Sequence, residues 1–205
     1  VAEVGGEYPD AVARHNPEAT IASRGCPVGC WFCIVPKMEG RTFTLLPDFP
    51  VRPILCDNNL SALPADYQEY VLRRYAETGT VLRDANSGFE PKTFTPDVYA
   101  RWKPAINIGG GPWRFAYDEC REGIEVRQVM AMLKDEPQRR KRVYVLIGNE
   151  PFADCMGRIQ EVIDNASDEA LGGHCTHIAV TQNTDGSITV EDNGRGLPAE
   201  DRDRL

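Results

Sequence analysis

The chain of 205 residues contains 41% hydrophobic and 26% charged residues, which is ordinary for a soluble globular protein and excludes a collagen-like, mucin-like or wholly disordered chain. Its net charge of −8, with the acidic excess concentrated after Met156, leaves no basic patch that would indicate nucleic-acid binding. Because no run of about 18 apolar residues and no signal peptide is visible, we expect no membrane span and a cytoplasmic location.

The first part of the sequence predicts an alternation of strands and helices. Residues 1–16 are polar and Gly-rich, so we expect a loop or a ragged end there. The strands are expected at residues 19–23, 51–56, 80–84, 113–117 and 143–147, and the helices at residues 64–77, 96–102 and 121–134. A strand, loop and helix that recur about every 30 residues indicate βα units. The fold class is therefore α/β, and residues 1–157 are predicted to form a partial parallel barrel of about five βα units, with the chemistry at the carboxyl ends of the strands.

The pattern changes after Gly157, so a second domain is predicted over residues 158–205. Residues 158–171 read as a helix that ends before Gly172 and Gly173. Residues 177–181 and 187–192 alternate apolar and polar side chains, with Asp185-Gly186 between them. This is the pattern of a β-hairpin, and antiparallel pairing does not continue a parallel βα series.

Three of the seven cysteines fall within eight residues, as Cys26, Cys30 and Cys33. Thiolates at gaps of three and two can surround one face of an iron–sulfur cluster, and three ligands leave one iron of a four-iron cluster open to a small molecule. A structural zinc site is the alternative, although it normally has a fourth Cys or His nearby. We interpret the isolated cysteines as small buried residues; they are Cys56, Cys120, Cys155 and Cys175.

With this CxxxCxxC motif, the region from about Ala19 to Asp164 resembles the radical S-adenosylmethionine enzymes. The resemblance implies a 4Fe–4S cluster held by Cys26, Cys30 and Cys33. It also implies reductive cleavage of S-adenosylmethionine to a 5′-deoxyadenosyl radical, a reductant such as flavodoxin or ferredoxin, and a substrate that the residues do not reveal. Phe32, before the last cysteine, would pack against the adenine.

The same resemblance gives roles to polar residues at the expected strand ends. Asp57 and Asn58 stand where the family holds the methionine amino group, and Asn86 where it contacts ribose or substrate. Asp118 ends the next strand, and Gly148 lies in half of an adenine-binding motif, where it could offer backbone contacts. The alternative for these positions is a turn or a helix cap, which Asn and Asp also favour.

The C-terminal residues 158–205 are similar to a second family, the ATPase domain of DNA gyrase B and topoisomerase IV. Glu161, Asn165 and Asp168 lie four and seven residues apart, so they share a helix face. The similarity implies that Glu161 activates the attacking water, that Asn165 holds magnesium and that Asp192 reads the adenine amino group. Gly194 and Gly196 would let the nucleotide approach, and the last residues are more similar to the ATP domain of a histidine kinase.

The two resemblances meet near Glu161, which predicts a joined chain: a natural fusion, a designed chimera or an assembly artefact of two fragments. The leading hypothesis from the sequence is a radical S-adenosylmethionine enzyme. The alternative is an ATP-binding fragment of a type II topoisomerase, or an inactive chimera. The second glycine-rich lid that would surround the phosphates is missing, so ATP binding is expected to be weak.

Overall fold

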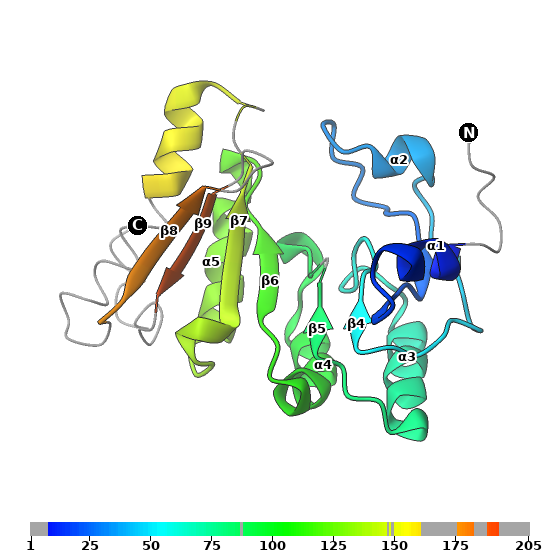
Figure 1. The fold of residues 1–205 in the computed structure, drawn as a ribbon. Coiled ribbons are helices and arrows are strands. Elements are labelled where there is room, and N and C mark those ends of the chain that lie inside the picture. Colours follow the sequence, from blue (N-terminus) through cyan, green and yellow to red (C-terminus); the bar gives the residue numbers. More distant parts are fainter. Residues whose placement is uncertain are drawn as a thin grey trace. The chain divides into compact units, whose positions relative to one another are not determined.

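The computed structural model describes residues 8–86, 88–146, 148, 150–160, 176–182 and 188–192 (Figure 1). The chain divides into two compact units, Val1–Gly111 and Pro112–Leu205. In the described parts, no helix has both the length and the apolar character needed to cross a membrane.

The first unit is built on a three-stranded parallel sheet in the order β1-β4-β5. Its strands are β1 (Ala19–Thr20), β4 (Ile54–Leu55) and β5 (Asp84–Ala85). Its helices are α1 (Tyr8–His15), α2 (Val35–Met38), α3 (Ala65–Thr78), η1 (Pro91–Thr93) and α4 (Pro96–Gly109). Two further short strands, β2 (Ser23–Arg24) and β3 (Thr44–Leu45), pair antiparallel and close the loop that carries the three clustered cysteines.

The core of the first unit is organised around the buried side chain of Gln68. Its amide nitrogen donates to the carbonyl oxygen of Leu63 at 2.7 Å, and its amide oxygen accepts from the indole nitrogen of Trp102 at 2.9 Å. Trp102 is fully buried and meets the ring of Phe89 edge to face. The hydrogen bonds satisfy a polar group that would otherwise be costly to bury, and they join α3 to α4.

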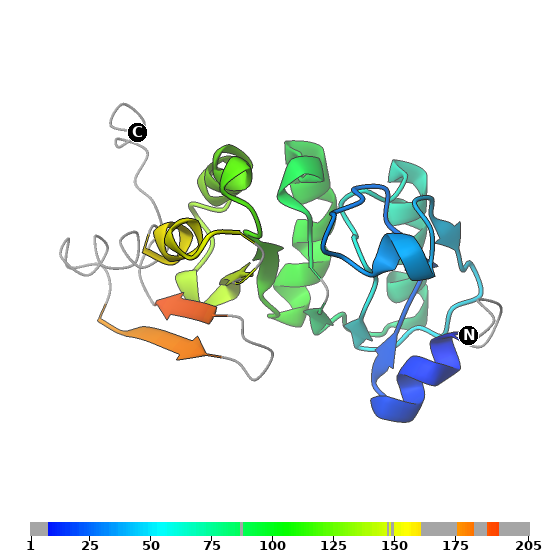
Figure 2. The same ribbon diagram turned by 90° about the horizontal axis from the view of Figure 1, so that it is seen from above.

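The second unit contains a mixed four-stranded sheet in the order β6-β7-β9-β8. Its strands are β6 (Trp113–Ala116), β7 (Lys141–Val145), β8 (Ile178–Gln182) and β9 (Ile188–Asp192). Its helices are η2 (Cys120–Glu122), α5 (Gly123–Met132), η3 (Gln138–Arg140) and a helix over residues 152–160. β6 and β7 are parallel, whereas β9 pairs antiparallel with both β7 and β8. Figure 2 shows α5 and the helix over residues 152–160 on the same face of this sheet.

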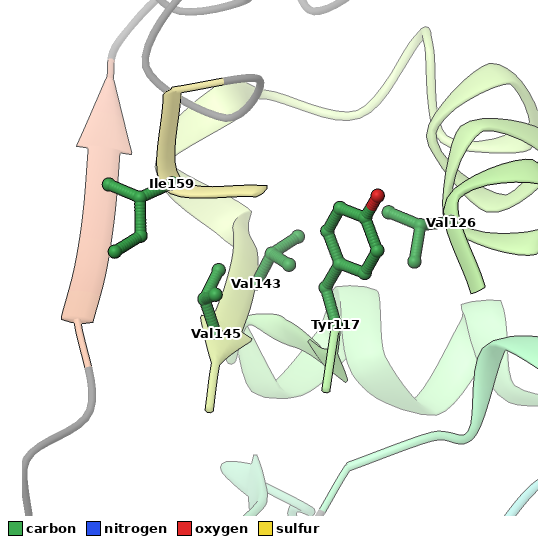
Figure 3. Close-up of a cluster of buried hydrophobic side chains, with 5 residues drawn as sticks. All are labelled: Tyr117, Val126, Val143, Val145 and Ile159. Atoms are coloured by element: carbon green, nitrogen blue, oxygen red, sulfur yellow. The ribbon is translucent and has the colours of Figure 1, made fainter. Parts of the chain in front are cut away.

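A small apolar cluster lies between that face of the sheet and the two helices (Figure 3). Val143 and Val145 come from β7, Val126 comes from α5, Ile159 comes from the helix over residues 152–160, and Tyr117 directly follows β6. Each of these side chains is buried. Burial of apolar side chains is the main favourable contribution to folding, so this cluster fixes both helices against β7.

Several elements differ from the sequence-based expectations. The expected N-terminal loop contains α1, which begins with Tyr8 and Pro9, since Pro is tolerated in the first turn of a helix. α4 was expected to end at Trp102, but it continues through Pro104 to Gly109. Pro104 removes one helical hydrogen bond, and the burial of Ile106 one half-turn further on favours continuation of the helix.

The parallel strands of the first unit are shorter than the apolar runs that predicted them. In the expected strand at 80–84, only Asp84 belongs to a strand, which continues to Ala85. The hairpin is present as β8 and β9, with Val180 opposite Val190. The partial barrel stays a prediction, because the parallel pairs of the described strands belong to separate sheets. The domain boundary expected at residue 157 also stays a prediction, and it falls within the second unit.

At Gly109, α4 lies very close to the backbone of the segment before β5. A Cβ atom at Gly109 would lie 1.7 Å from the carbonyl oxygen of Leu82, which is backbone and cannot rotate away. We expect Gly109→Ala to lower the free energy of unfolding by about 3 kcal/mol, the upper part of the range for overpacking.

The matched control is Gly110→Ala at the next position. Gly110 has a φ of 71° and open space around its Cβ position, so the cost is only the left-handed conformation, about 1 kcal/mol. Urea unfolding followed by circular dichroism measures both changes. Equal losses for the two variants would contradict the close approach.

Candidate functional site

The second unit holds a buried arginine that the sequence did not single out. Arg158, on the helix over residues 152–160, is 1% exposed. Its guanidinium forms an ion pair with Glu150 and donates to the carbonyl oxygen of Leu146 at 2.7 Å. It also lies over the ring of Tyr117, with 5.8 Å between Cζ and the ring centroid. These partners come from three different segments, so Arg158 ties the helix to the ends of β6 and β7.

The electrostatics of Arg158 follow from its partners. Burial alone would lower the pKa of a guanidinium, because it disfavours the charged form. The sulfur of Cys120 and the carboxylate of Glu150 act in the opposite direction, and the pKa of Arg158 is raised overall. The side chain is therefore a fixed positive charge within the unit. An arginine that is nearly fully buried is rare, and no spacing in the sequence could have revealed it.

A cavity of about 420 Å³ opens beside this arginine, between η2, the first turns of α5 and the helix over residues 152–160. Cys120, Arg127 and Asp154 line it together with Arg158. Gly157, with open space at its Cβ position, also borders it. The helix that borders this cavity leads directly into the segment with the ATPase-like motif.

The structure places only part of that motif. Asp192 is the last residue of β9, where its backbone is opposite Ile178 at the start of β8. Glu161, Asn165, Gly194 and Gly196 lie outside the described residues. The sheet therefore positions Asp192 at one end of the hairpin, and the proposed water-activating and magnesium-binding residues remain sequence-based expectations.

In the first unit, the polar residues after β4 tie neighbouring loops together. Asp57 is completely buried and accepts hydrogen bonds from the backbone nitrogen of Ala22 at 2.9 Å and from the hydroxyl of Ser23 at 2.5 Å. Asn58 donates to the carboxylate of Glu39 at 2.6 Å. Burial raises the pKa of Asp57 to about 6, although its hydrogen bonds oppose the shift. These contacts hold the Asp-Asn-Asn segment against the segments around Ala22 and Glu39.

The other expected strand-end residues also have local contacts. The amide nitrogen of Asn86 lies 3.9 Å from the sulfur of Cys56. The backbone nitrogen of Asp118 donates to the carboxylate of Glu122 at 2.8 Å, within the turn that begins η2. Gly148 has a φ of 92°, which favours glycine at this turn. Asp118 and Gly148 belong to the second unit and Asn86 to the first.

The cysteine segment is held as a compact loop. The backbone nitrogen of Cys26 donates to the carbonyl oxygen of Gly40 at 3.3 Å, and that of Cys33 to Cys30 at 3.1 Å. Phe32 meets Trp31 edge to face, with 5.7 Å between ring centroids. Within the part of the chain that the structure describes, no three His, Cys, Asp or Glu side chains are grouped closely enough to hold a metal ion.

The isolated cysteines differ in their exposure. Cys155 is buried as expected, whereas Cys56 is half-buried and Cys120 is exposed. Cys175 lies outside the described residues. The expectation of burial was therefore wrong for Cys120, because this cysteine borders the cavity of the second unit.

Comparison with known proteins gives matches to ATPases. Residues 157–205 match a family described as histidine kinase-, DNA gyrase B- and HSP90-like ATPase. The DNA gyrase B protein of Synechocystis is 51% identical over 61 residues, which are 30% of this chain and 6% of that protein. The gyrase B protein of Rickettsia typhi is 43% identical over 86 residues, 40% of this chain and 10% of that protein. That of Thermus thermophilus is 48% identical over 61 residues, 30% of this chain and 10% of that protein.

The matches cover only short parts of these relatives. The chain spans 6% to 10% of the length of these three relatives. The Rickettsia match covers more residues than the family match, so the similarity is not confined to residues 157–205. No solved structure matches the chain. The C-terminal segment is thus similar to the gyrase B-like ATPase domain, in agreement with the motif of acidic residues, asparagine and glycines in its sequence.

The radical S-adenosylmethionine function predicted from the cysteine triplet is wrong. The matches point to the ATPase family instead. The described residues show no metal-binding group at Cys26, Cys30 and Cys33. The expected 4Fe–4S cluster and S-adenosylmethionine therefore have no support. Sequence spacing alone does not establish a metal site, because thiols three and four residues apart converge on a metal only if the loop turns them towards one another.

The buried carboxyl group of Asp57 predicts a pH dependence of stability. Its pKa is about 6 in the folded chain and 3.8 ordinarily, so the folded state holds the proton more tightly. The contribution of this group to the free energy of unfolding is therefore fully present below about pH 4, and it is lost as the pH rises through about 6. The expected loss is about 3 kcal/mol, since each pKa unit corresponds to about 1.4 kcal/mol.

Asp57→Asn removes the titration. Its oxygen can still accept from the backbone nitrogen of Ala22, and its nitrogen can donate to the hydroxyl oxygen of Ser23, which reverses the direction of that hydrogen bond. We expect this variant to gain about 3 kcal/mol relative to the unchanged protein between pH 4 and pH 7. Urea unfolding at several pH values measures the difference. A difference that stays constant across this range would contradict the raised pKa.

The buried ion pair of Arg158 predicts a large effect of its removal. The side chains of Arg158 and Glu150 are 1% and 24% exposed, so Arg158→Gln leaves a mostly buried carboxylate without its partner. We expect a loss of about 3 kcal/mol in the free energy of unfolding. The control is Arg73→Gln. The side chains of Arg73 and its ion-pair partner Glu77 are 63% and 61% exposed, so the expected loss is below about 1 kcal/mol. Similar small losses for both variants would show that Arg158 does not anchor the unit.

Proposed function

We propose that residues 157–205 form part of a binding site for ATP and magnesium. The observation that carries the proposal is the match of this segment to the histidine kinase-, gyrase B- and HSP90-like ATPases. The match includes Glu161, Asn165 and Asp192, which have the residue types and order of the ATPase motif. Of these three residues, Asp192 falls within the described part of the chain, as the last residue of β9.

Each proposed role follows from simple chemistry. The carboxylate of Asp192 accepts a hydrogen bond from the exocyclic amino group of adenine. Gly194 and Gly196 have no Cβ atom, which lets the backbone come close to the nucleotide. The amide oxygen of Asn165 is a hard ligand suited to magnesium, which neutralises charge on the phosphates. Glu161 acts as the general base that orients and activates water.

The extent of hydrolysis depends on donors around the phosphates, because the charge of the transition state must be met where it develops. The motif in residues 157–205 supplies a base, a magnesium ligand and an adenine acceptor, but not a set of phosphate donors. We therefore propose that this segment confers nucleotide binding, with a dissociation constant of about 1 mM, and that hydrolysis by it alone is at background level.

Nucleotide protection against unfolding tests the proposal. With a dissociation constant of about 1 mM, ATP and magnesium at about 10 mM are expected to stabilise the chain by roughly 1.4 kcal/mol. Asp192→Ala removes the acceptor for the adenine amino group and should abolish the effect. Asp203→Ala, also acidic but outside the motif, should retain it.

GTP serves as a second control in the same measurement. Its base carries a carbonyl oxygen where adenine carries the amino group, so it cannot donate to Asp192 and should stabilise the chain less than ATP. If ATP and GTP stabilise the chain equally, and if Asp192→Ala does not change this, the effect is a general one of polyphosphate or magnesium. That result would contradict the proposed adenine site.

A further inference from the structure

Two cysteine sulfurs in the second unit contact the same guanidinium. One terminal nitrogen of Arg158 lies 3.7 Å from the sulfur of Cys120, and the other lies 3.6 Å from the sulfur of Cys155. The sulfur of Cys120 is also 3.7 Å from the carbonyl oxygen of Asp154, the residue directly before Cys155. The two thiols, 35 positions apart in the sequence, are therefore brought to one place by the fold.

The surroundings give the two thiols different accessibility. Cys120 is exposed and borders the cavity of about 420 Å³, which leaves room for its side chain to rotate. Cys155 is 1% exposed and its sulfur lies 3.5 Å from the carbonyl oxygen of Glu150. An accessible thiol that can react first, next to a protected thiol that can resolve the product, is the arrangement of a reversible thiol pair.

We propose that Cys120 and Cys155 form a reversible disulfide that links the segment after β6 to the helix over residues 152–160. The oxidant is a small-molecule disulfide such as oxidised glutathione. The thiolate of Cys120 attacks one of its sulfurs and releases one small thiol. The thiolate of Cys155 then attacks the sulfur of Cys120 and releases the second. The two protein thiols lose two electrons and two protons, and the small disulfide gains them as two thiols.

Burial raises the pKa of the Cys120 thiol, and the nearby guanidinium of Arg158 opposes this shift only in part. Thiolate attack by Cys120 is therefore expected to be faster at alkaline pH. Oxidation removes two sulfur acceptors from the guanidinium, but the ion pair with Glu150 and the hydrogen bond to Leu146 do not involve sulfur. The buried charge therefore keeps its partners in both redox states. The disulfide closes a loop within the second unit and does not depend on nucleotide binding.

Peptide mapping of the full chain tests the proposal. The protein is incubated with oxidised glutathione, the remaining thiols are blocked with a maleimide, and the digest is analysed by mass spectrometry without reduction. We expect a cross-linked pair of peptides that contain Cys120 and Cys155, with a mass loss of about 2 Da, since two hydrogens leave. Closure of the loop should raise the unfolding temperature by roughly 10 °C, and dithiothreitol should reverse the change.

Three variants make the assignment specific. Cys120→Ser and Cys155→Ser should each abolish the cross-linked pair and the rise in unfolding temperature. Cys56→Ser, at a half-buried thiol beside Asn86 in the first unit, should leave both unchanged. If Cys155→Ser does not fold, the map of the unchanged protein together with Cys120→Ser decides.

The proposal is overturned if Cys120 is recovered only as a mixed disulfide with glutathione. It is also overturned if Cys120 pairs with a cysteine other than Cys155. Either result would show that Cys120 and Cys155 do not form the disulfide, in which the two sulfurs would be about 2.05 Å apart.

Discussion

The guanidinium of Arg158 is a full positive charge held away from water, and the arrangement of the second unit depends on how that charge is met. Removing a guanidinium from water is costly unless it is paired and hydrogen-bonded. Glu150 supplies the opposite charge, Leu146 a carbonyl acceptor and Tyr117 an aromatic face. Any shift of the helix over residues 152–160 would break these contacts together, so the helix has one well-defined position on the sheet.

The first unit has an analogous buried charge of opposite sign. Asp57 connects the chain after β4 to the turn after β1 through its contacts to Ala22 and Ser23. Tyr67 adds a further hydrogen bond to the carbonyl oxygen of Ala22 at 2.7 Å. A polar group that is buried with good partners specifies which loops meet. In both units a buried charged side chain thus holds irregular segments of the chain together.

The sequence predicted features that arise from local periodicity. The alternation in residues 177–192 identified the hairpin. The helical spacing of Tyr67, Tyr70, Val71 and Tyr75 identified α3, in which all of these except the half-buried Tyr70 are buried. Sequence-based prediction failed where distant contacts decide. The apolar spacing in residues 121–134 predicts a helix with Ile124 available for its buried side, but Ile124 is 61% exposed and borders the cavity. Nothing in the sequence distinguished Arg158 from the other arginines, and cysteine spacing alone could not show how the loop around Cys26, Cys30 and Cys33 folds.

The mixed pairing around β7 also determines where the chain can be divided for expression. β7 is parallel to β6 on one side and antiparallel to β9 on the other. A piece that begins at residue 157, where the family match starts, would lack β7 and leave β9 with unpaired backbone groups along one side. Such an open strand edge is a template for association with other chains. A fragment that starts near Pro112 keeps the sheet intact, so it is the more suitable unit for isolating the ATPase-like segment.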